Sequence, residues 1–222
     1  MLYNLFSNPV TRAMAISLLC AIGFAGVALL IGANRIAVFD SSVIASIQGM
    51  ENDRLTYILS FFTWIGTGLP VAIITASAAL FLYAALKHRM ELLLLVAVVG
   101  GTGLLNYLLK LVFKRARPEI YRIAEANGYS FPSGHSMVAF SLYGILAYLL
   151  WRHIPRRAGR IVLIAISSLF ILTIGISRIY LGVHYPSDVL GGYLASGCWM
   201  FGLIWLYDGK YGKSAVTHRG GP

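Results

Sequence analysis

Charged residues are scarce in this sequence. They make up 12% of its 222 residues, whereas a soluble globular domain carries about a quarter. Hydrophobic residues account for 58%, and the mean hydropathy is +0.75. This balance excludes an ordinary water-soluble domain and indicates an integral membrane protein. Because a spanning helix needs roughly 20 apolar residues, the chain has room for about six spans and little else.

Cysteine is also scarce, and the common metal-binding patterns are absent. Cys20 and Cys198 both lie in long apolar runs, where a thiol behaves as a small hydrophobic group. The sequence contains no HExxH motif and no cysteine cluster, so we expect no metal and no cofactor. The net charge of +10 raises the question of nucleic acid, but no base-stacking aromatic motif accompanies it. We therefore expect no nucleic-acid partner.

The apolar runs predict an all-α polytopic membrane protein with about six transmembrane helices in one bundle. The first run is longer than a signal-peptide core and is interpreted as an uncleaved span. Glycines and a proline within 66–70 predict a kink in the second span, and three glycines within 100–103 predict a close helix contact in the third. The expected spans cover residues 14–33, 58–86, 92–111, 136–151, 161–177 and 189–207.

A short amphipathic helix is expected on the outer surface after the first span. Asp40 and Ser41 are predicted to cap it, and Ile44 and Ile47 lie on its apolar face opposite the polar residue Gln48. We expect residues 1–207 to form a single transmembrane domain whose polar motifs fall within 110–188. Residues 208–222 are expected to form a short cytoplasmic tail.

The distribution of charge predicts the orientation. Six spans place both termini on one side of the membrane, and that side carries ten Lys or Arg residues against two carboxylates, a net charge of +8. The other side carries eight against six, a net charge of +2. The positive-inside rule therefore predicts a plasma-membrane protein with cytoplasmic termini. The basic cluster at 110–122 must then lie outside for another reason.

Three polar segments interrupt the apolar chain, and the expected topology brings all three to the same outer face. They are Lys110–Pro118, Pro132–His135 and Ser177–Asp188. Their patterns, KxxxxxxRP, PSGH and SRxxxxxHxxxD, resemble the signature of the type 2 phosphatidic acid phosphatase (PAP2) family, which includes bacterial lipid phosphatases and vanadium haloperoxidases. Every specified position of the signature is matched in order, so the resemblance is specific.

The residue types in these segments suit phosphate chemistry. Phosphoryl transfer spreads negative charge over oxygen atoms, and Lys110, Arg117 and Arg178 can supply cationic donors for them. Ser133 and Gly134 precede a predicted span, where the backbone N–H groups of a helix start can bind an anion. We expect these five residues to bind the phosphate.

The resemblance implies a role for each of the other polar residues. His184 would attack phosphorus and form a phosphohistidine, Asp188 would hold its ring in the attacking tautomer, and His135 would protonate the departing lipid oxygen. Water would then release phosphate as the second substrate. The resemblance implies no metal in this reaction.

The implied function is hydrolysis of an isoprenoid or glycerolipid (pyro)phosphate at the outer membrane face. Undecaprenyl pyrophosphate and phosphatidylglycerophosphate are the first candidates, ahead of phosphatidic acid and lipid A phosphates. The expected partners are this lipid and the surrounding membrane lipids, with no obligatory protein partner. A non-catalytic phospholipid binder or transporter with a retained phosphate pocket is an alternative. A haloperoxidase is disfavoured because those relatives are soluble.

Other polar and aromatic residues have simpler explanations. Lys114 and Arg115 can equally contact lipid head groups at a helix end. The remaining histidines are expected at the surface, and several aromatic residues and glycines are expected to serve packing or the membrane interface. These residues are His88, His153, His218, Tyr180, Tyr185, Trp199, Gly191 and Gly192.

Overall fold

The computed structural model describes residues 8–84, 89–119 and 121–211, and all regular structure in this part of the chain is helical. The predicted all-α fold is therefore confirmed. In order, the helices are α2 (Pro9–Gly32), α3 (Ala37–Gln48), α4 (Asp53–Ile65), α5 (Gly68–Ala84), α6 (Arg89–Phe113), α7 (Gly134–Trp151), α8 (Arg157–Tyr180) and α9 (Pro186–Tyr211).

Five of these helices, α2, α6, α7, α8 and α9, are long and apolar enough to cross a membrane. Helices α4 and α5 pass the same test together and meet at a bend of 55°, at the predicted kink. Counted as one bent span, they are the sixth candidate span. The outward surfaces are apolar, as Ile22 and Leu29 illustrate with exposed fractions of 70% and 73%. Such surfaces suit lipid, and the chain is a multi-pass membrane protein.

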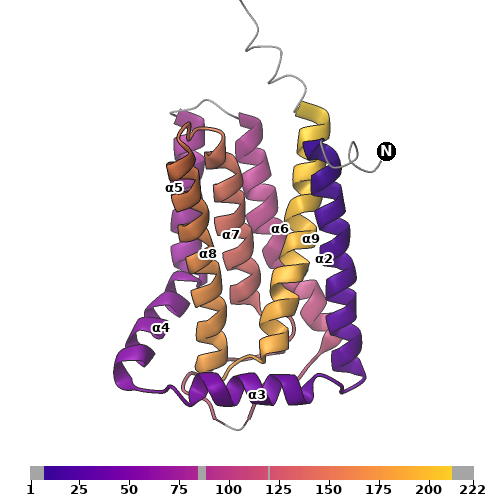
Figure 1. Cartoon of the computed structure of the whole chain (residues 1–222), viewed down its shortest axis with the longest axis vertical. Coiled ribbons are helices and arrows are strands. Elements are labelled where there is room, and N and C mark those ends of the chain that lie inside the picture. The colour runs from indigo at the N-terminus through magenta and orange to yellow at the C-terminus, as the bar shows by residue number, and fades with distance from the viewer. Residues whose placement is uncertain (1–7, 85–88, 120, 212–222) are drawn as a thin grey trace, which may run out of the picture.

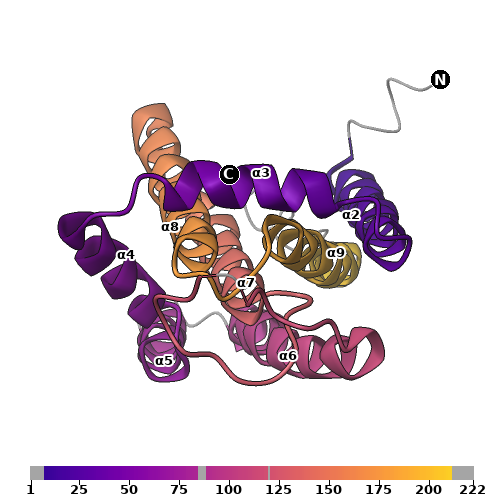
Figure 2. The same cartoon turned by 90° about the horizontal axis from the view of Figure 1, so that it is seen from below.

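The spans surround α7, which lies near the centre of the bundle (Figures 1 and 2) and contacts α5, α6, α8 and α9. Helix α2 packs along α9. Helix α3 lies across one end of the bundle, and we call this end the α3 end (Figure 1). The first and last described residues both lie at the opposite end.

Local sequence signals set the helix starts at the α3 end. The side chain of Asn52 caps α4 by accepting a hydrogen bond from the Leu55 N–H group at 3.0 Å. Pro186 opens α9 at a position where its missing N–H group costs nothing. Ser133 has an extended conformation and precedes α7 as its N-cap residue. Several of the polar residues identified from the sequence therefore lie at or beside helix ends.

Close packing fixes the start of α7 against the start of α9. A Cβ atom at Gly192 of α9 would lie only 2.9 Å from the carbonyl oxygen of Ser133, so the backbones approach as only glycine permits. Gly191 similarly leaves room for the ring of Phe131. Both glycines serve packing, as predicted. Toward the other end, Leu95, Val98 and Ile145 are fully buried in the core between α6 and α7.

The short helix after the first span is present, but its predicted cap is wrong. Helix α3 begins at Ala37, and Asp40 lies in its first turn with an exposed fraction of 2%. Asp40 faces inward because it accepts hydrogen bonds from the backbone and side chain of Ser187, at 2.9 and 2.6 Å. A tertiary partner from the distant residue 187 thus overrides the local capping pattern.

The last span continues beyond its predicted end at residue 207. Helix α9 runs to Tyr211, and Asp208, predicted to begin the tail, is buried within it. Its carboxylate accepts hydrogen bonds from Tyr148 at 2.6 Å and Arg152 at 2.8 Å, which explains the longer helix. His153 is exposed at this end, as predicted. The rest of the predicted tail, His88 and His218 lie outside the described residues.

Candidate active site

The three polar segments meet at the α3 end of the bundle. Lys110 lies in the last turn of α6, His135 in the first turn of α7, Arg178 in the last turn of α8 and Asp188 in the first turn of α9. Arg117 follows α6, and His184 lies between α8 and α9. His135 interacts electrostatically with Arg178, His184, Lys110 and Arg117. The structure therefore brings the predicted cations and both histidines into one cluster.

The buried ring of His184 lies between an anion and a cation. Its Nδ1 atom is 3.4 Å from Oδ2 of Asp188, and its Nε2 atom is 3.2 Å from a guanidinium nitrogen of Arg117. These partners assign the proton to Nδ1 and leave the Nε2 lone pair facing the cations. Burial, partly offset by Asp188, lowers the pKa of His184 to about 4. The ring is therefore neutral at pH 7.

Asp188 is fully buried and accepts hydrogen bonds on both carboxylate oxygens. Oδ2 accepts from the hydroxyl of Ser130 at 2.6 Å and the N–H group of Tyr185 at 2.9 Å, besides its contact with His184. Oδ1 accepts from Arg115 at 2.6 Å. A buried carboxylate with this many donors stays ionised and holds one orientation. It can therefore fix the ring of His184.

Arg117 is positioned by backbone carbonyl groups. Its guanidinium donates to the carbonyl oxygens of Gly128 at 3.0 Å, Asn127 at 2.9 Å and Val183 at 2.8 Å. Burial lowers the pKa of Arg117, but a guanidinium group in a protein stays protonated at neutral pH. The loop between α6 and α7 thus holds a permanent cation beside His184.

The start of α7 carries the second polar segment. The fully buried hydroxyl of Ser133 accepts a hydrogen bond from Ser136 at 3.0 Å, and the Ser133 N–H group donates to the carbonyl oxygen of Asp188 at 3.0 Å. Asn106 of α6 supports this turn by donating to the carbonyl oxygen of Pro132 at 3.1 Å, and Gly134 packs against its side chain. The first N–H groups of a helix lack partners within it and can bind an anion.

Two buried nitrogen atoms in the cluster are not hydrogen-bonded to any residue that the structure describes. In the described part of the chain, Nε2 of His135 and Nε of Arg178 have no hydrogen-bond acceptor. An unsatisfied buried donor costs about 1–3 kcal/mol. A bound phosphate would supply acceptor oxygens to both. No group of three or more His, Cys, Asp or Glu side chains among the described residues is placed to hold a metal ion.

Sequence reasoning missed several residues that support the cluster. Arg115 was expected at lipid head groups as readily as Lys114, but it lies against Asp188, whereas Lys114 is exposed. Asp40 and Ser130 also belong to this hydrogen-bond network. Thr63 of α4 accepts from Arg178 at 3.4 Å. The sequence shows only that these residues are polar and lie near predicted helix ends. It does not show which side chains they contact.

Tyr180, Tyr185 and Trp199 make packing contacts, which is one of the two roles expected for them. Tyr180 is fully buried, and its hydroxyl lies 2.7 Å from that of Thr56. The indole of Trp199 donates to the carbonyl oxygen of Ala97 at 3.3 Å. Tyr185 lies beneath the guanidinium of Arg115, whose central carbon is 4.1 Å from the ring centroid. Trp199 therefore joins α9 to α6 away from the cluster, whereas Tyr180 joins α8 to α4 and Tyr185 stacks on Arg115 at the α3 end.

Comparisons with known proteins agree with this arrangement. The family model described as PAP2 superfamily matches residues 91–211. The chain is 33% identical to phosphatidylglycerophosphatase B of Bacillus subtilis strain 168, over 80% of this chain and 87% of that protein. It is 32% identical to undecaprenyl-diphosphatase BcrC of the same organism, over 67% of this chain and 74% of that protein.

A solved structure shows the same fold. The crystal structure of a transmembrane PAP2 type phosphatidylglycerolphosphate phosphatase from Bacillus subtilis is similar with a TM-score of 0.75 and 32% identity. The similarity covers 88% of this chain and 96% of that chain. The family match, the sequence identity and the shared fold together show that this chain belongs to the PAP2 superfamily of membrane lipid phosphatases.

Proposed function

We propose that this enzyme is a metal-independent phosphatase that hydrolyses an isoprenoid or glycerolipid (pyro)phosphate through a phosphohistidine on His184. The observation that carries the proposal is the position of the His184 ring. Its Nδ1 atom faces Asp188 at 3.4 Å, and its Nε2 lone pair faces Arg117 at 3.2 Å. A neutral imidazole with a fixed tautomer beside a cationic pocket suits attack on a phosphate.

In the first step, Nε2 of His184 attacks phosphorus as the bond from phosphorus to the lipid oxygen breaks. The electron pair of that bond goes to the leaving oxygen, which takes a proton from His135. Lys110, Arg117 and Arg178 stabilise the negative charge on the other phosphate oxygens. Ser133 and the N–H group of Gly134 bind the same group at the helix start.

In the second step, water attacks the phosphohistidine and the bond between phosphorus and nitrogen breaks. His135, now neutral, accepts a proton from the water. Asp188 stabilises the positive charge that His184 carries while it is phosphorylated, because its carboxylate faces Nδ1. Inorganic phosphate leaves, and the enzyme returns to its starting state. The proton given in the first step is recovered in the second.

The relatives guide the choice of substrate. Those named for phosphatidylglycerophosphate and for undecaprenyl diphosphate both match most of this chain. We therefore propose undecaprenyl pyrophosphate and phosphatidylglycerophosphate as the main candidates, with phosphatidic acid and lipid A phosphates next. All four present a terminal phosphate on a membrane lipid, which is the group that the cluster is suited to bind.

The charge distribution supports an active site at the outer face of the plasma membrane. The basic segment 152–160 lies at the end opposite α3, where both ends of the described chain also lie. The positive-inside rule makes that end cytoplasmic. A cysteine introduced at Arg156, after replacement of Cys20 and Cys198, should resist an impermeant thiol reagent added outside intact cells. Rapid labelling there would reverse the proposed orientation.

The function is tested by measuring phosphate release from the four candidate lipids by the detergent-purified protein with EDTA present. We expect release from at least one lipid, abolished in His184→Ala, and a radiolabelled phosphoprotein from lipid that carries labelled phosphate, trapped by quenching in alkaline detergent because phosphohistidine is labile in acid. Loss of turnover in EDTA with recovery on added metal would contradict the metal-free mechanism. Retained turnover in His184→Ala would contradict the assigned nucleophile. A folded protein that binds lipid phosphate without cleaving it would favour the binder or transporter.

A further inference from the structure

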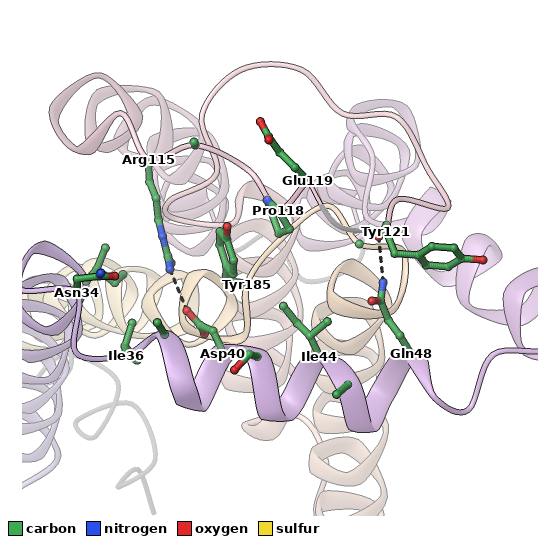
Figure 3. Close-up of a pocket in the computed structure, with 16 residues that line it drawn as sticks. Asn34, Ile36, Asp40, Ile44, Gln48, Arg115, Pro118, Glu119, Tyr121 and Tyr185 are labelled. Carbon is green, nitrogen blue, oxygen red and sulfur yellow. Dashed lines mark hydrogen bonds and ion pairs between the residues drawn. The ribbon is translucent and has the colours of Figure 1, made fainter.

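Arg115 joins two carboxylates that come from different parts of the chain. One terminal nitrogen donates to Oδ1 of Asp188 at 2.6 Å, and the other donates to Oδ2 of Asp40 at 2.9 Å. The first nitrogen also donates to the hydroxyl of Ser187 at 2.8 Å. Figure 3 shows Arg115 reaching from the loop after α6 toward Asp40 on α3. A single guanidinium therefore connects α3 to the aspartate that contacts His184.

This connection is largely shielded from solvent. The exposed fractions of the side chains are 16% for Arg115, 2% for Asp40 and 0% for Asp188. Charged pairs in such a setting are weakly screened and strongly directional. Arg115 provides the hydrogen bond to Oδ1 of Asp188, whereas the contact with His184 is on Oδ2. Arg115 thereby limits rotation of the carboxylate that orients the nucleophile.

Helix α3 holds Arg115 in place. Asp40 is itself fixed by two hydrogen bonds from Ser187, next to Asp188 in the chain. Near the other end of α3, Gln48 donates to the carbonyl oxygens of Tyr121 and Tyr180, both at 3.2 Å. Between these anchors, α3 and the loop enclose a pocket of about 580 Å³ (Figure 3). The helix is thus attached to the active-site loop near both ends.

We infer that Arg115 and Asp40 are positioning residues for the hydrolytic reaction, acting on His184 through Asp188. This inference rests on the proposed function of His184 as nucleophile. Arg115 lies at an unspecified position of the first motif and Asp40 lies outside all three motifs. The mechanism above gives neither residue a part. Their role is to keep the Asp188 carboxylate in the orientation that presents Nε2 of His184 to the phosphate.

The charges of the two residues should act on His184 in opposite directions. The charged and titratable groups that face His184 are Asp188 on α9, Arg117 in the loop and Arg178 on α8, with His135 on α7 and Lys110 on α6 in the same cluster. Loss of the Arg115 cation favours a protonated ring and raises the pKa of His184. Loss of the Asp40 anion lowers it. A purely structural role would not give opposite shifts.

The test compares Arg115→Gln, Arg115→Lys, Asp40→Asn and the double variant Arg115→Gln/Asp40→Asn with wild type on one lipid. Mutating the hydrogen-bond partners that orient metal-bound histidines typically costs about 10- to 100-fold in activity, and we take the same range for residues that act on His184 through Asp188. We expect Arg115→Gln to lower kcat by that factor with KM within about threefold. The acid limb of a pH profile is the range in which kcat/KM declines as the pH falls. For Arg115→Gln we expect this decline at a pH about half a unit higher than in wild type, and for Asp40→Asn at a lower pH. The double variant should have an acid limb near the wild-type position.

Arg35→Gln is the matched control, because Arg35 is an exposed cation at the same end of the bundle. It removes the same charge and should keep the wild-type kcat and pH profile. If Arg115→Gln fails to fold, Arg115→Lys and the double variant replace it, since both leave fewer unbalanced charges. Wild-type kcat in the folded Arg115 variants, or acid limbs that move the same way for Arg115 and Asp40, would overturn the inference.

The same experiment separates this inference from the proposed function. If wild type releases no phosphate, or if His184→Ala remains active, the proposed function has failed and the inference fails with it. If wild type is active and His184→Ala is inactive while the folded Arg115 and Asp40 variants match wild type, only the positioning role has failed. Thermal unfolding of each variant in detergent distinguishes folded from unfolded protein.

Discussion

The imidazole of His135 packs against Gly66, the residue that ends α4 at the broken span. A Cβ atom at position 66 would lie 3.3 Å from Cδ2 of the His135 ring. It would also lie 3.1 Å from Cγ2 of Ile174 and 3.3 Å from the carbonyl oxygen of Thr63. With contacts on three sides, an added methyl group can be accommodated only by moving a neighbour. The residue at the break between α4 and α5 therefore packs closely against His135, the proposed general acid.

We expect Gly66→Ala to lower kcat by displacing His135. A displacement of about 1 Å at a catalytic group can cost about 100-fold in rate, so a shift of a few tenths of an ångström should cost roughly 3- to 10-fold. KM should change little, because the cationic residues are untouched. The measurement is steady-state phosphate release. Gly68→Ala is the control, since a Cβ atom there meets nothing within 4 Å. Equal kcat values in the two variants would contradict the fitted contact.

The pH dependence of the reaction should reflect the burial of His184. Burial lowers the pKa of His184 to about 4 from an ordinary value of about 6.5. The attacking ring must be neutral, so it is competent above its pKa and is lost only as the pH falls through about 4. We therefore expect the enzyme's acid limb in kcat/KM near pH 4. Titration of the substrate phosphate also changes kcat/KM at low pH. Measuring two substrates with different phosphate pKa values separates the two effects, because the decline caused by the enzyme occurs at the same pH for both. A fixed limb near pH 6.5 would contradict this prediction.

The sequence predicted the spans well because lipid-facing helices must be apolar over their whole length. The bend at the second span followed from glycines and a proline within 66–70, and α4 and α5 do break there. The ends were less accurate. Helix α9 extends beyond its predicted end because Asp208 accepts hydrogen bonds from Tyr148 and Arg152. Local sequence patterns do not predict contacts between residues this far apart in the chain.

The predicted site residues do converge at one end of the bundle. The residues that hold them in place could not be identified from the sequence. Arg115 and Lys114 are adjacent basic residues at the end of the same span, and their surroundings differ completely. Asp40 has the local pattern of a helix cap and instead bonds to Ser187 and Arg115. Such residues owe their role to contacts over more than 70 positions, which spacing along the chain does not encode.

Asp188→Asn should nearly abolish turnover while leaving substrate binding. An amide can present its NH₂ group to Nδ1 of His184 and so favour the wrong tautomer. The corresponding change in a serine-protease triad costs about 10⁴-fold in kcat, and we expect a loss of about 10²- to 10⁴-fold here. Samples quenched in alkaline detergent, which preserves the bond between phosphorus and nitrogen, should then contain less phosphohistidine than wild type. Glu119→Gln, at an exposed acidic residue of the nearby loop, should behave as wild type. Near wild-type turnover in Asp188→Asn would contradict an orienting role.

The glycines at 100–103 differ in what they contact, which yields a prediction about stability. A Cβ atom at Gly101 would overlap the indole ring of Trp199 on α9, whereas one at Gly103 meets nothing within 4 Å. Gly101→Ala must therefore displace the indole, and overpacking of this kind costs about 1–3 kcal/mol. Gly103→Ala adds helix propensity without a clash and should be neutral or stabilising by up to about 1 kcal/mol. Thermal unfolding in one detergent compares the two. Equal melting temperatures would contradict the prediction that a side chain at position 101 destabilises the contact between α6 and α9.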